Sequence, residues 1–243
     1  NSVTSKWDWV AASQEVEMSY VIDSYTKLLI PFNGTDGDTN DQTALTGQTV
    51  SLGGNAQLDT EYKKFGTASL LLDGDGDYAS VPDSDDWSFG TDPFTIDLYA
   101  RFTSIGNAPR CLLSQYGTDY WRIVYEENAK LLKIYSYVSS AYAVNVYGSW
   151  TPTEGTFYHL EFSRASESQF YIFADGSPLS LTISLSGSKS MASNTGALIM
   201  GIHNPSALSY PFSGNIDMLR VRKGLCAHTT NFTPPNEANF FEV

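Results

Sequence analysis

The chain has 243 residues, of which 42% are hydrophobic, 14% are aromatic and 17% are charged, and its formal net charge at pH 7 is -13. So few charged residues exclude a disordered chain, a coiled coil and a helical bundle. The acidic balance excludes nucleic acid as a partner, because phosphate binding needs clustered Lys and Arg and the longest basic cluster is the short RVRKG at 220–224.

The N-terminal segment, residues 1–25, stands apart from the rest of the chain. The stretch SQEVEMSYVIDSY at 13–25 predicts a helix, and Trp7 and Trp9 precede it. We expect the segment either to pack back on the domain or to dock on a partner. The sequence starts without an initiator Met or a signal peptide, so we expect a processed product or a piece of a longer protein. It contains no run of about 18 apolar residues, so we expect no membrane insertion.

Most of the remaining segments have the patterns of β-strands. In FTIDLYARF at 94–102, apolar residues alternate with Thr95, Asp97, Tyr99 and Arg101, which predicts a half-buried strand. Residues 120–138 and 157–176 each predict a hairpin, and residues 197–202 and 211–221 predict two more strands. Turns rich in Gly, Pro, Asn and Asp recur between them. The sequence therefore predicts an all-β fold, an antiparallel β-sandwich.

The stretch LLLDGDGDYASVPDSDDW at 70–87 is rich in aspartate and resembles a calcium loop. An EF-hand loop needs Gly at position 6 and an acidic ligand at position 12. Counted from Asp73, these positions hold Tyr78 and Ser84, so the template fails. Counted from Asp36, they hold Asp41 and Gly47, and it fails again. Both stretches predict turns, where Asp and Gly tolerate positive φ.

Five segments in order resemble the laminin-G-like, concanavalin A-like lectin/glucanase jelly rolls found in bacteriophage and bacterial surface proteins. They are TKLLIPFNGTDG (26–37), residues 56–102, residues 150–179, residues 198–224 and NFTPP (231–235). The resemblance implies two antiparallel sheets packed face to face, with glycans often bound on a concave sheet or on the loops at its edge. It places the domain at residues 26–235, between the N-terminal extension and a C-terminal tail at 236–243. It also implies that residues 73–77 are a turn between a strand ending at 72 and a returning strand at 78–81.

The resemblance also implies one structural calcium ion, held between the opening loop and the last strand. Asp36 or Asp38, together with Asp217, would be the matching carboxylates. Calcium accepts a flexible set of oxygen ligands, which such a discontinuous site requires. The alternative is that Asp217 caps a backbone segment or pairs with Arg220 or Arg222.

The sequence does not support catalysis, and we expect that the protein is not an enzyme. Glucanases of this superfamily carry two glutamates flanking an aspartate on one strand, and glycoside hydrolysis needs two converging carboxylates. Residues 94–102 hold one acid, Asp97, and Glu161 stands alone in YHLEF. Glu126 and Glu127 are adjacent in a hairpin turn and face opposite ways. The sequence excludes a lyase less well than a hydrolase.

Tyrosines gather between residues 116 and 150 and predict a ligand-binding surface. Sugars stack their C–H faces on aromatic rings while polar side chains bind the hydroxyls. The alternation in YWRIVY places Tyr120, Arg122 and Val124 on one face and Trp121, on the other, in the core. A structural role for the cluster is the alternative. The candidate ligand-binding residues are Tyr116, Asp119, Tyr120, Tyr135, Tyr137 and Tyr142.

Together these patterns predict a non-catalytic recognition or adhesion module that binds a cell-surface glycan. The resemblance places it in a virion, as a phage fibre, decoration or tail accessory, or on an extracellular surface, with residues 1–25 docking on other subunits. A purely structural virion decoration and a glycan-cleaving enzyme are the alternatives. The two cysteines, Cys111 and Cys226, are either free thiols or one disulfide.

Overall fold

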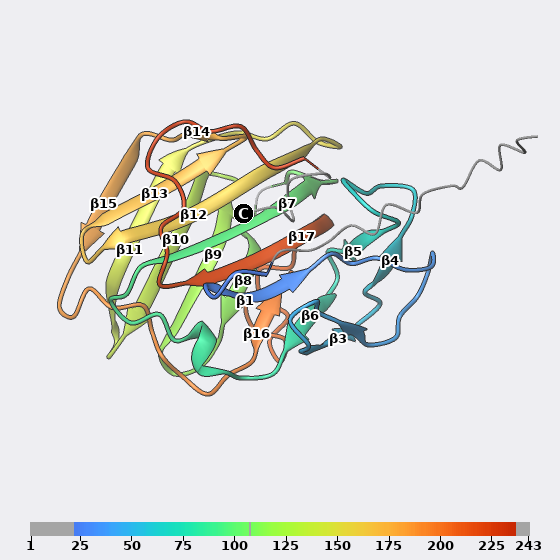
Figure 1. The fold of residues 1–243 in the computed structure, drawn as a ribbon, viewed down its shortest axis with the longest axis horizontal. Helices are drawn as coiled ribbons and strands as arrows, with labels where there is room; N and C mark the ends of the chain where they lie inside the picture. The colour runs from blue at the N-terminus through green and yellow to red at the C-terminus, as the bar shows by residue number, and fades with distance from the viewer. Residues whose placement is uncertain (1–21, 107, 237–243) are drawn as a thin grey trace, which may run out of the picture.

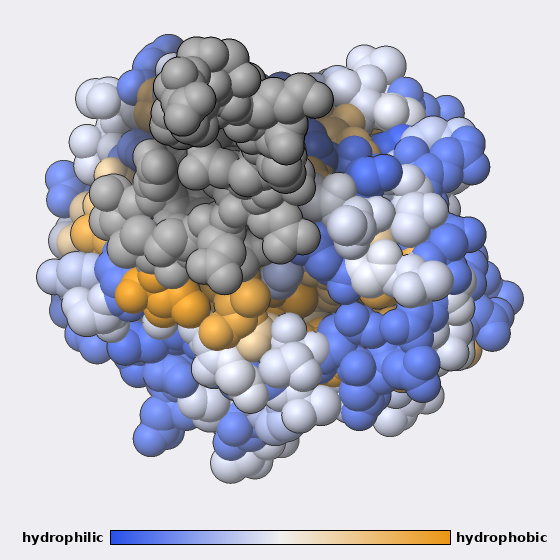
Figure 2. All heavy atoms as spheres, turned by 45° about the vertical axis from the view of Figure 1, so that its right-hand side comes forward, coloured by the Kyte–Doolittle hydropathy of each residue, from blue (hydrophilic) through white to orange (hydrophobic). Residues whose placement is uncertain are grey.

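The computed structural model describes residues 22–106 and 108–236. Within these ranges the chain forms 17 β-strands, arranged as two antiparallel sheets packed face to face (Figure 1). The antiparallel β-sandwich predicted from the sequence is therefore confirmed. Figure 2 shows that the surface of one side is mostly hydrophilic, with hydrophobic side chains gathered in one band. No helix in the described ranges is long and apolar enough to cross a membrane.

The first sheet has eight strands, with β17 (Ser213–Lys223) at its centre. β17 pairs with β7 (Phe94–Phe102), with β5 (Ser69–Asp73) and with β1 (Thr26–Ile30). The remaining strands extend the sheet in the order β14-β13-β12-β7 on one side and β5-β4 on the other. They are β14 (Ser177–Pro178), β13 (Gln169–Ala174), β12 (Phe157–Ser166) and β4 (Gln57–Asp59).

The second sheet has nine strands in the order β15-β11-β10-β9-β8-β16-β6-β3-β2 and lies behind the first in Figure 1. Four of its strands follow one another in both sequence and space, because tight turns join them into a meander. They are β8 (Arg110–Gln115), β9 (Tyr120–Glu126), β10 (Leu131–Val138) and β11 (Ala141–Ser149). The other strands are β15 (Leu181–Leu185), β16 (Leu198–Met200), β6 (Tyr78–Val81), β3 (Thr49–Gly53) and β2 (Gln42–Thr43).

The hydrophobic core lies between the two sheets and is built by the alternation seen in the sequence. Phe94, Ile96 and Leu98 of β7 are at most 1% exposed, and so are Trp121 and Ile123 of β9. Burying a side chain of this size contributes about 1.5–3 kcal/mol to stability. The prediction that Trp121 belongs to the core is confirmed.

The opposite face of β7 differs from the prediction of a half-buried strand. Thr95, Asp97 and Tyr99 are at most 2% exposed. The cause is the segment after β17, residues 224–236, which turns back across the outer face of the first sheet and is drawn red in Figure 1. The Thr95 hydroxyl donates to the carbonyl of Leu225 (2.9 Å), and the Tyr99 hydroxyl donates to that of Pro235. The amide of Phe232 donates to the carbonyl of Gly176 (3.0 Å).

The aspartate-rich turn predicted at residues 73–77 begins one residue later, because β5 includes Asp73, and it connects the strands differently from the prediction. β5 ends at Asp73 and β6 begins at Tyr78, yet the two strands belong to opposite sheets, so the turn crosses the sandwich and no hairpin forms. Gly74 and Gly76 take φ of 88° and 84°, which glycine adopts without strain. The Asp77 carboxylate, 1% exposed, accepts from the amides of Asn55 (2.5 Å) and Asp73 (2.9 Å).

The predicted terminal segments fall largely outside the described residues. Of the helix predicted at 13–25, the structure describes residues 22–25, which are not helical and lead through a turn into β1. The Asp23 carboxylate stabilises this turn by accepting from the amides of Tyr25 (2.9 Å) and Thr26 (2.7 Å). Of the predicted tail at 236–243, only Asn236 is described. Cys111 and Cys226 are free thiols.

Candidate ligand-binding face

The outer face of the second sheet carries two rows of large polar side chains. Directly opposed residues of an antiparallel pair point to the same side of the sheet. Tyr137 lies opposite both Tyr120 and Tyr142, and Tyr135 lies opposite both Arg122 and Asn145. Because the alternate residues Trp121 and Ile123 enter the core, these rows face outward. We call this surface the tyrosine face, and its residues are Tyr116, Tyr120, Arg122, Tyr135, Tyr137, Tyr142, Asn145, His203 and Tyr210.

The tyrosine rings contact one another across the strands. The rings of Tyr120 and Tyr137 stack at 5.3 Å with an interplanar angle of 19°. Tyr142 contacts Tyr137 edge-on at 5.3 Å and Tyr135 at 5.4 Å, and Tyr116 stacks on Tyr120 at 6.4 Å. The structure thus brings together all five of the tyrosines selected from the sequence. Tyr142 and Tyr116 are 49% and 38% exposed, whereas Tyr135 is 2% exposed. The face therefore has exposed rings at its surface and a buried ring beneath them.

Asp119, the sixth residue selected from the sequence, supports the tyrosine face from its edge. Its Oδ1 accepts from the amide of Ser139 at 2.9 Å. Ser139 and Ser140 form the turn between β10 and β11 and have φ of 50° and 66°, so this turn needs an anchor. The carboxylate therefore fixes the turn that brings Tyr142 beside Tyr137. A direct role of Asp119 in ligand binding stays a prediction.

A loop from a distant part of the sequence completes the tyrosine face. The Ser114 hydroxyl, which shares a face with Arg122, donates to the carbonyl of Ile202 at 3.0 Å and holds the loop against the sheet. The ring of His203 then contacts Tyr120 at 4.8 Å, Tyr116 at 5.0 Å and Tyr210 at 5.9 Å. Sequence reasoning missed His203 and Tyr210, because no local pattern links this loop to β9.

Arg122 lies beneath the rings and is 9% exposed. Its Cζ lies 4.3 Å from the ring centroid of Tyr210, 4.5 Å from that of Tyr135 and 5.5 Å from that of Tyr120. Each such cation–π contact contributes about 0.5–2 kcal/mol. Burial, and then the charge of Arg122, lowers the pKa of His203 to about 3. The imidazole is therefore neutral at neutral pH, and Arg122 is the cation at the centre of this face.

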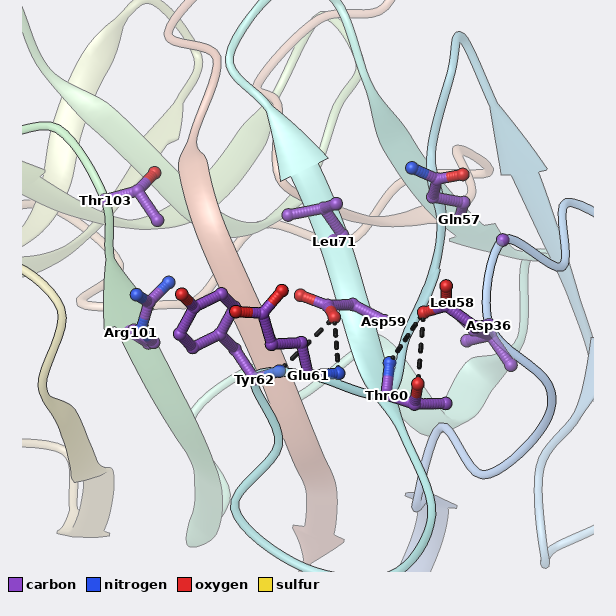
Figure 3. Close-up of a pocket in the computed structure, with 11 residues that line it drawn as sticks. Asp36, Gln57, Leu58, Asp59, Thr60, Glu61, Tyr62, Leu71, Arg101 and Thr103 are labelled. Carbon is purple, nitrogen blue, oxygen red and sulfur yellow. Dashed lines mark hydrogen bonds between the residues drawn. The ribbon is translucent and has the colours of Figure 1, made fainter.

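A second, more polar surface is a pocket of about 420 Å³ at the edge of the first sheet. Figure 3 shows Asp59, Glu61 and Tyr62 beside Arg101, with Asp36 and Thr60 at the other end. The Arg101 guanidinium stacks on the Tyr62 ring at 3.8 Å. The carboxylates bind the loop itself: Asp36 accepts from the amide of Thr60 (3.0 Å), and Asp59 accepts from that of Glu61 (2.8 Å). The Asp36 and Asp59 carboxylates of this pocket therefore stabilise its loop.

The three carboxylates selected for calcium also accept hydrogen bonds from the protein. Asp217 Oδ2 accepts from the amides of Lys64 (2.8 Å) and Phe65 (3.1 Å), and Asp38 accepts from the amide of Asn40 (3.0 Å). Among the described residues, no three His, Cys, Asp or Glu side chains form a group that could hold a metal ion. Calcium binding stays a prediction, tested by the change in melting temperature on calcium addition.

Two carboxylates that stand alone in the sequence meet in the first sheet. Asp97 of β7 lies directly opposite Glu161 of β12, and both side chains are fully buried. Glu161 accepts from Ser163 Oγ (2.7 Å) and pairs with His228 Nδ1 (2.8 Å). Burial alone would raise the pKa of Asp97, but the charges of Arg220 and Arg222 hold it well below its usual range. Residues 225–235 cover this pair.

The family model of the concanavalin A-like lectin/glucanases superfamily matches residues 73–225. The chain belongs to this superfamily. Its fold and the resemblance stated from the sequence are thereby confirmed. None of the curated proteins matches the sequence.

Several solved structures share the superfamily fold at low sequence identity. Domain 4 of AbnA, a GH43 extracellular arabinanase from Geobacillus stearothermophilus in complex with arabinotriose, has a TM-score of 0.62 at 16% identity, covering 90% of this chain and all of that domain. The receptor binding domain of botulinum neurotoxin D has a TM-score of 0.59 at 12% identity, covering 83% of this chain and 50% of the toxin domain. Trypanosoma rangeli sialidase has a TM-score of 0.54 at 13% identity, covering 83% of this chain and 31% of the sialidase. The superfamily fold therefore occurs in binding domains and in glycosidases.

Proposed function

We propose that this jelly-roll domain is a non-catalytic recognition module that binds a cell-surface glycan on the tyrosine face. The observation that carries the proposal is the continuous set of rings, from exposed Tyr116 and Tyr142 down to buried Tyr135. A soluble protein rarely exposes aromatic rings in one patch without a partner for them. The C–H face of a pyranose matches such rings, and ring hydroxyls and the Asn145 amide lie beside them to bind sugar hydroxyls.

The surroundings of the described carboxylates support a binding role over a hydrolytic one. Glycoside cleavage needs two carboxyl groups that flank the bond in an open cleft. Asp97 and Glu161 form a pair, but both are fully buried under residues 225–235. At the tyrosine face, Asp119 holds the Ser139 amide and Glu126 is paired with Lys133 (3.0 Å). These acids have structural partners, and the aromatic rings are what the face offers to a ligand.

The context we propose is a virion or an extracellular surface. In the superfamily, the arabinanase domain was solved with arabinotriose and the toxin domain is a receptor binding domain, which favours glycan recognition outside the cell. Within a virion, the module would belong to a phage fibre, decoration or tail accessory protein. Residues 1–25 would then dock on a neighbouring subunit, and their deletion should abolish incorporation into the particle.

A glycan array with purified protein tests the proposal. We expect binding to a defined set of glycans, reduced about 10-fold by Tyr142→Ala, because one exposed stacking ring contributes about 1 kcal/mol or more. Tyr25→Ala is the matched control, since Tyr25 is 44% exposed but lies far along the chain in the turn before β1. An array without bound glycans, or equal loss in both variants, would contradict the proposal.

A further inference from the structure

Arg164 and Arg220 are buried and have hydrogen-bond acceptors, and Arg222, whose Nε and Nη2 make no hydrogen bond, has an ion-pair partner, whereas Arg122 has neither among the described residues. Arg164 donates to four backbone carbonyls, those of Gly90, Ser166, Glu167 and Lys189, at 2.7–3.1 Å. Arg220 donates to Asp97 through two nitrogens, and Arg222 lies 3.5 Å from the same carboxylate. Arg122 is buried to the same degree, yet no side-chain hydrogen bond or ion pair joins its guanidinium to any residue in 22–106 or 108–236.

Two further polar atoms of the tyrosine face share this property. Asn145 Oδ1 and His203 Nδ1 are buried, and neither meets a partner within the described ranges. Asn145 lies two strands from Arg122, with Tyr135 opposite both. His203 packs on Tyr120 and Tyr116 from the loop above. Buried polar groups normally find hydrogen-bond partners, so this aromatic face has a local deficit of them.

The charge of Arg122 defines what this ligand must supply. A buried cation without a counter-ion is costly, and cation–π contacts offset only part of that cost. The carboxylates of Asp119 and Glu126, beside this face, already have partners. Asp119 accepts a hydrogen bond from the Ser139 amide, and Glu126 forms an ion pair with Lys133. Nε and Nη1 are fully buried, which leaves Nη2 as the nitrogen open to a ligand. A planar carboxylate takes hydrogen bonds from a guanidinium with good geometry.

We propose that Arg122 selects acidic glycans: the sugar that stacks on the tyrosine face carries a carboxylate, and this carboxylate binds the Arg122 guanidinium. The inference rests on the proposed function, because the rings must hold the sugar. It adds the class of ligand, a uronic or sialic-type sugar, and a residue that distinguishes it from a neutral one. Since the net charge of the protein is -13, a local cation is needed to overcome the repulsion between the protein and such a ligand.

Isothermal titration with matched sugars tests the inference. The probes are 3′-sialyllactose against lactose, and tetragalacturonate against its methyl ester. We expect at least one acidic sugar to bind about 10- to 100-fold more tightly than its neutral counterpart, the range for a hydrogen bond to a charged group. Arg122→Gln should abolish this preference, so that the variant binds the acidic sugar no more tightly than its neutral counterpart. Lys133→Gln, which removes the neighbouring cation on the same face, should leave the preference intact.

The outcomes separate this inference from the proposed function. Equal binding of acidic and neutral sugars by the natural protein, or a preference that survives in Arg122→Gln, overturns the role of Arg122 but leaves glycan binding standing. If no glycan of either kind binds in titration or on the array, both fail. Should Arg122→Gln not fold, the comparison of matched sugars with the natural protein still decides, and Arg122→Lys, which keeps the charge but loses the planar fork, should weaken the preference.

Discussion

Asp97 of β7 binds Arg220 of β17 through both carboxylate oxygens, with Nε–Oδ1 at 3.1 Å and Nη2–Oδ2 at 3.0 Å. The two residues lie opposite each other in register on neighbouring strands of the first sheet. Arg222 approaches the same carboxylate at 3.5 Å, so one aspartate serves two buried cations. The covering segment, residues 224–236, excludes water from these ion pairs. Loss of the Asp97 carboxylate would therefore leave the two cations without solvent and lower the stability of the fold.

Asp97→Ala should therefore destabilise the protein strongly. The change leaves Arg220 and Arg222 buried without their anion, a defect that costs about 3–5 kcal/mol. The free energy of unfolding from urea denaturation measures it. Asp41→Ala is the control, because Asp41 is exposed and should change stability by no more than about 0.5 kcal/mol. A similarly small loss for Asp97→Ala would show that the cations find other partners.

His203 should make stability depend on pH. Its pKa is about 3 in the folded protein and about 6.5 in an unfolded chain, so between these values the unfolded state binds more protons. Stability should thus fall as the pH drops from about 7 toward 4, and His203→Gln should flatten this slope. Unfolding curves at several pH values measure the effect. An unchanged slope in the variant would mean that His203 titrates normally in the folded state.

The two thiols should differ in reactivity. Burial raises the pKa of Cys111 to about 12, and burial also raises that of Cys226, which is only half-buried. The thiolate is the reactive form, so Cys111 should be inert to a disulfide reagent until the protein unfolds, while Cys226 should react slowly in the native state. Labelling followed by mass spectrometry identifies the modified residue, with denatured protein as the control in which both react. Rapid native labelling of Cys111 would contradict the structure.

Removal of the covering segment should weaken the first sheet. A chain ending at Gly224 loses Phe232, whose ring packs on Phe173 at 5.2 Å, and His228, which pairs with Glu161 at 2.8 Å. It also opens Asp97 and Tyr99 to water. We expect a lower melting temperature and faster amide hydrogen exchange in β7 and β12. Exchange confined to the tyrosine face, which is on the other sheet, would indicate a different role for this segment.

Only some residues of the tyrosine face could be predicted from the sequence. Alternation placed Tyr120 and Arg122 on one side of a strand, and Tyr135 and Tyr137 were selected because tyrosines gather between residues 116 and 150. His203 and Tyr210 were out of reach, because loops pack through long-range contacts that leave no local periodicity. The lack of a partner for Arg122 is likewise a property of the three-dimensional structure.

In the first sheet, too, the sequence predicted some features and could not predict others. The pattern at 94–102 identified a strand but gave half-burial, because alternation reports side-chain polarity and does not reveal a distant segment that covers the polar side. The turn predicted at 73–77 was right to within one residue. Its local chemistry is the same whether the next strand returns to the same sheet or crosses to the other one, so the sequence could not distinguish the two.

The position of β17 has a consequence for how the protein is made. This strand is the last of the described strands to be synthesised, yet it lies between β7 and β5 and also binds β1. Until residues 213–223 leave the ribosome, the strands on both sides of it have unpaired edges, which are templates for aggregation. The domain therefore folds as one unit after synthesis of its last strand, and prematurely terminated chains should require a chaperone or be degraded.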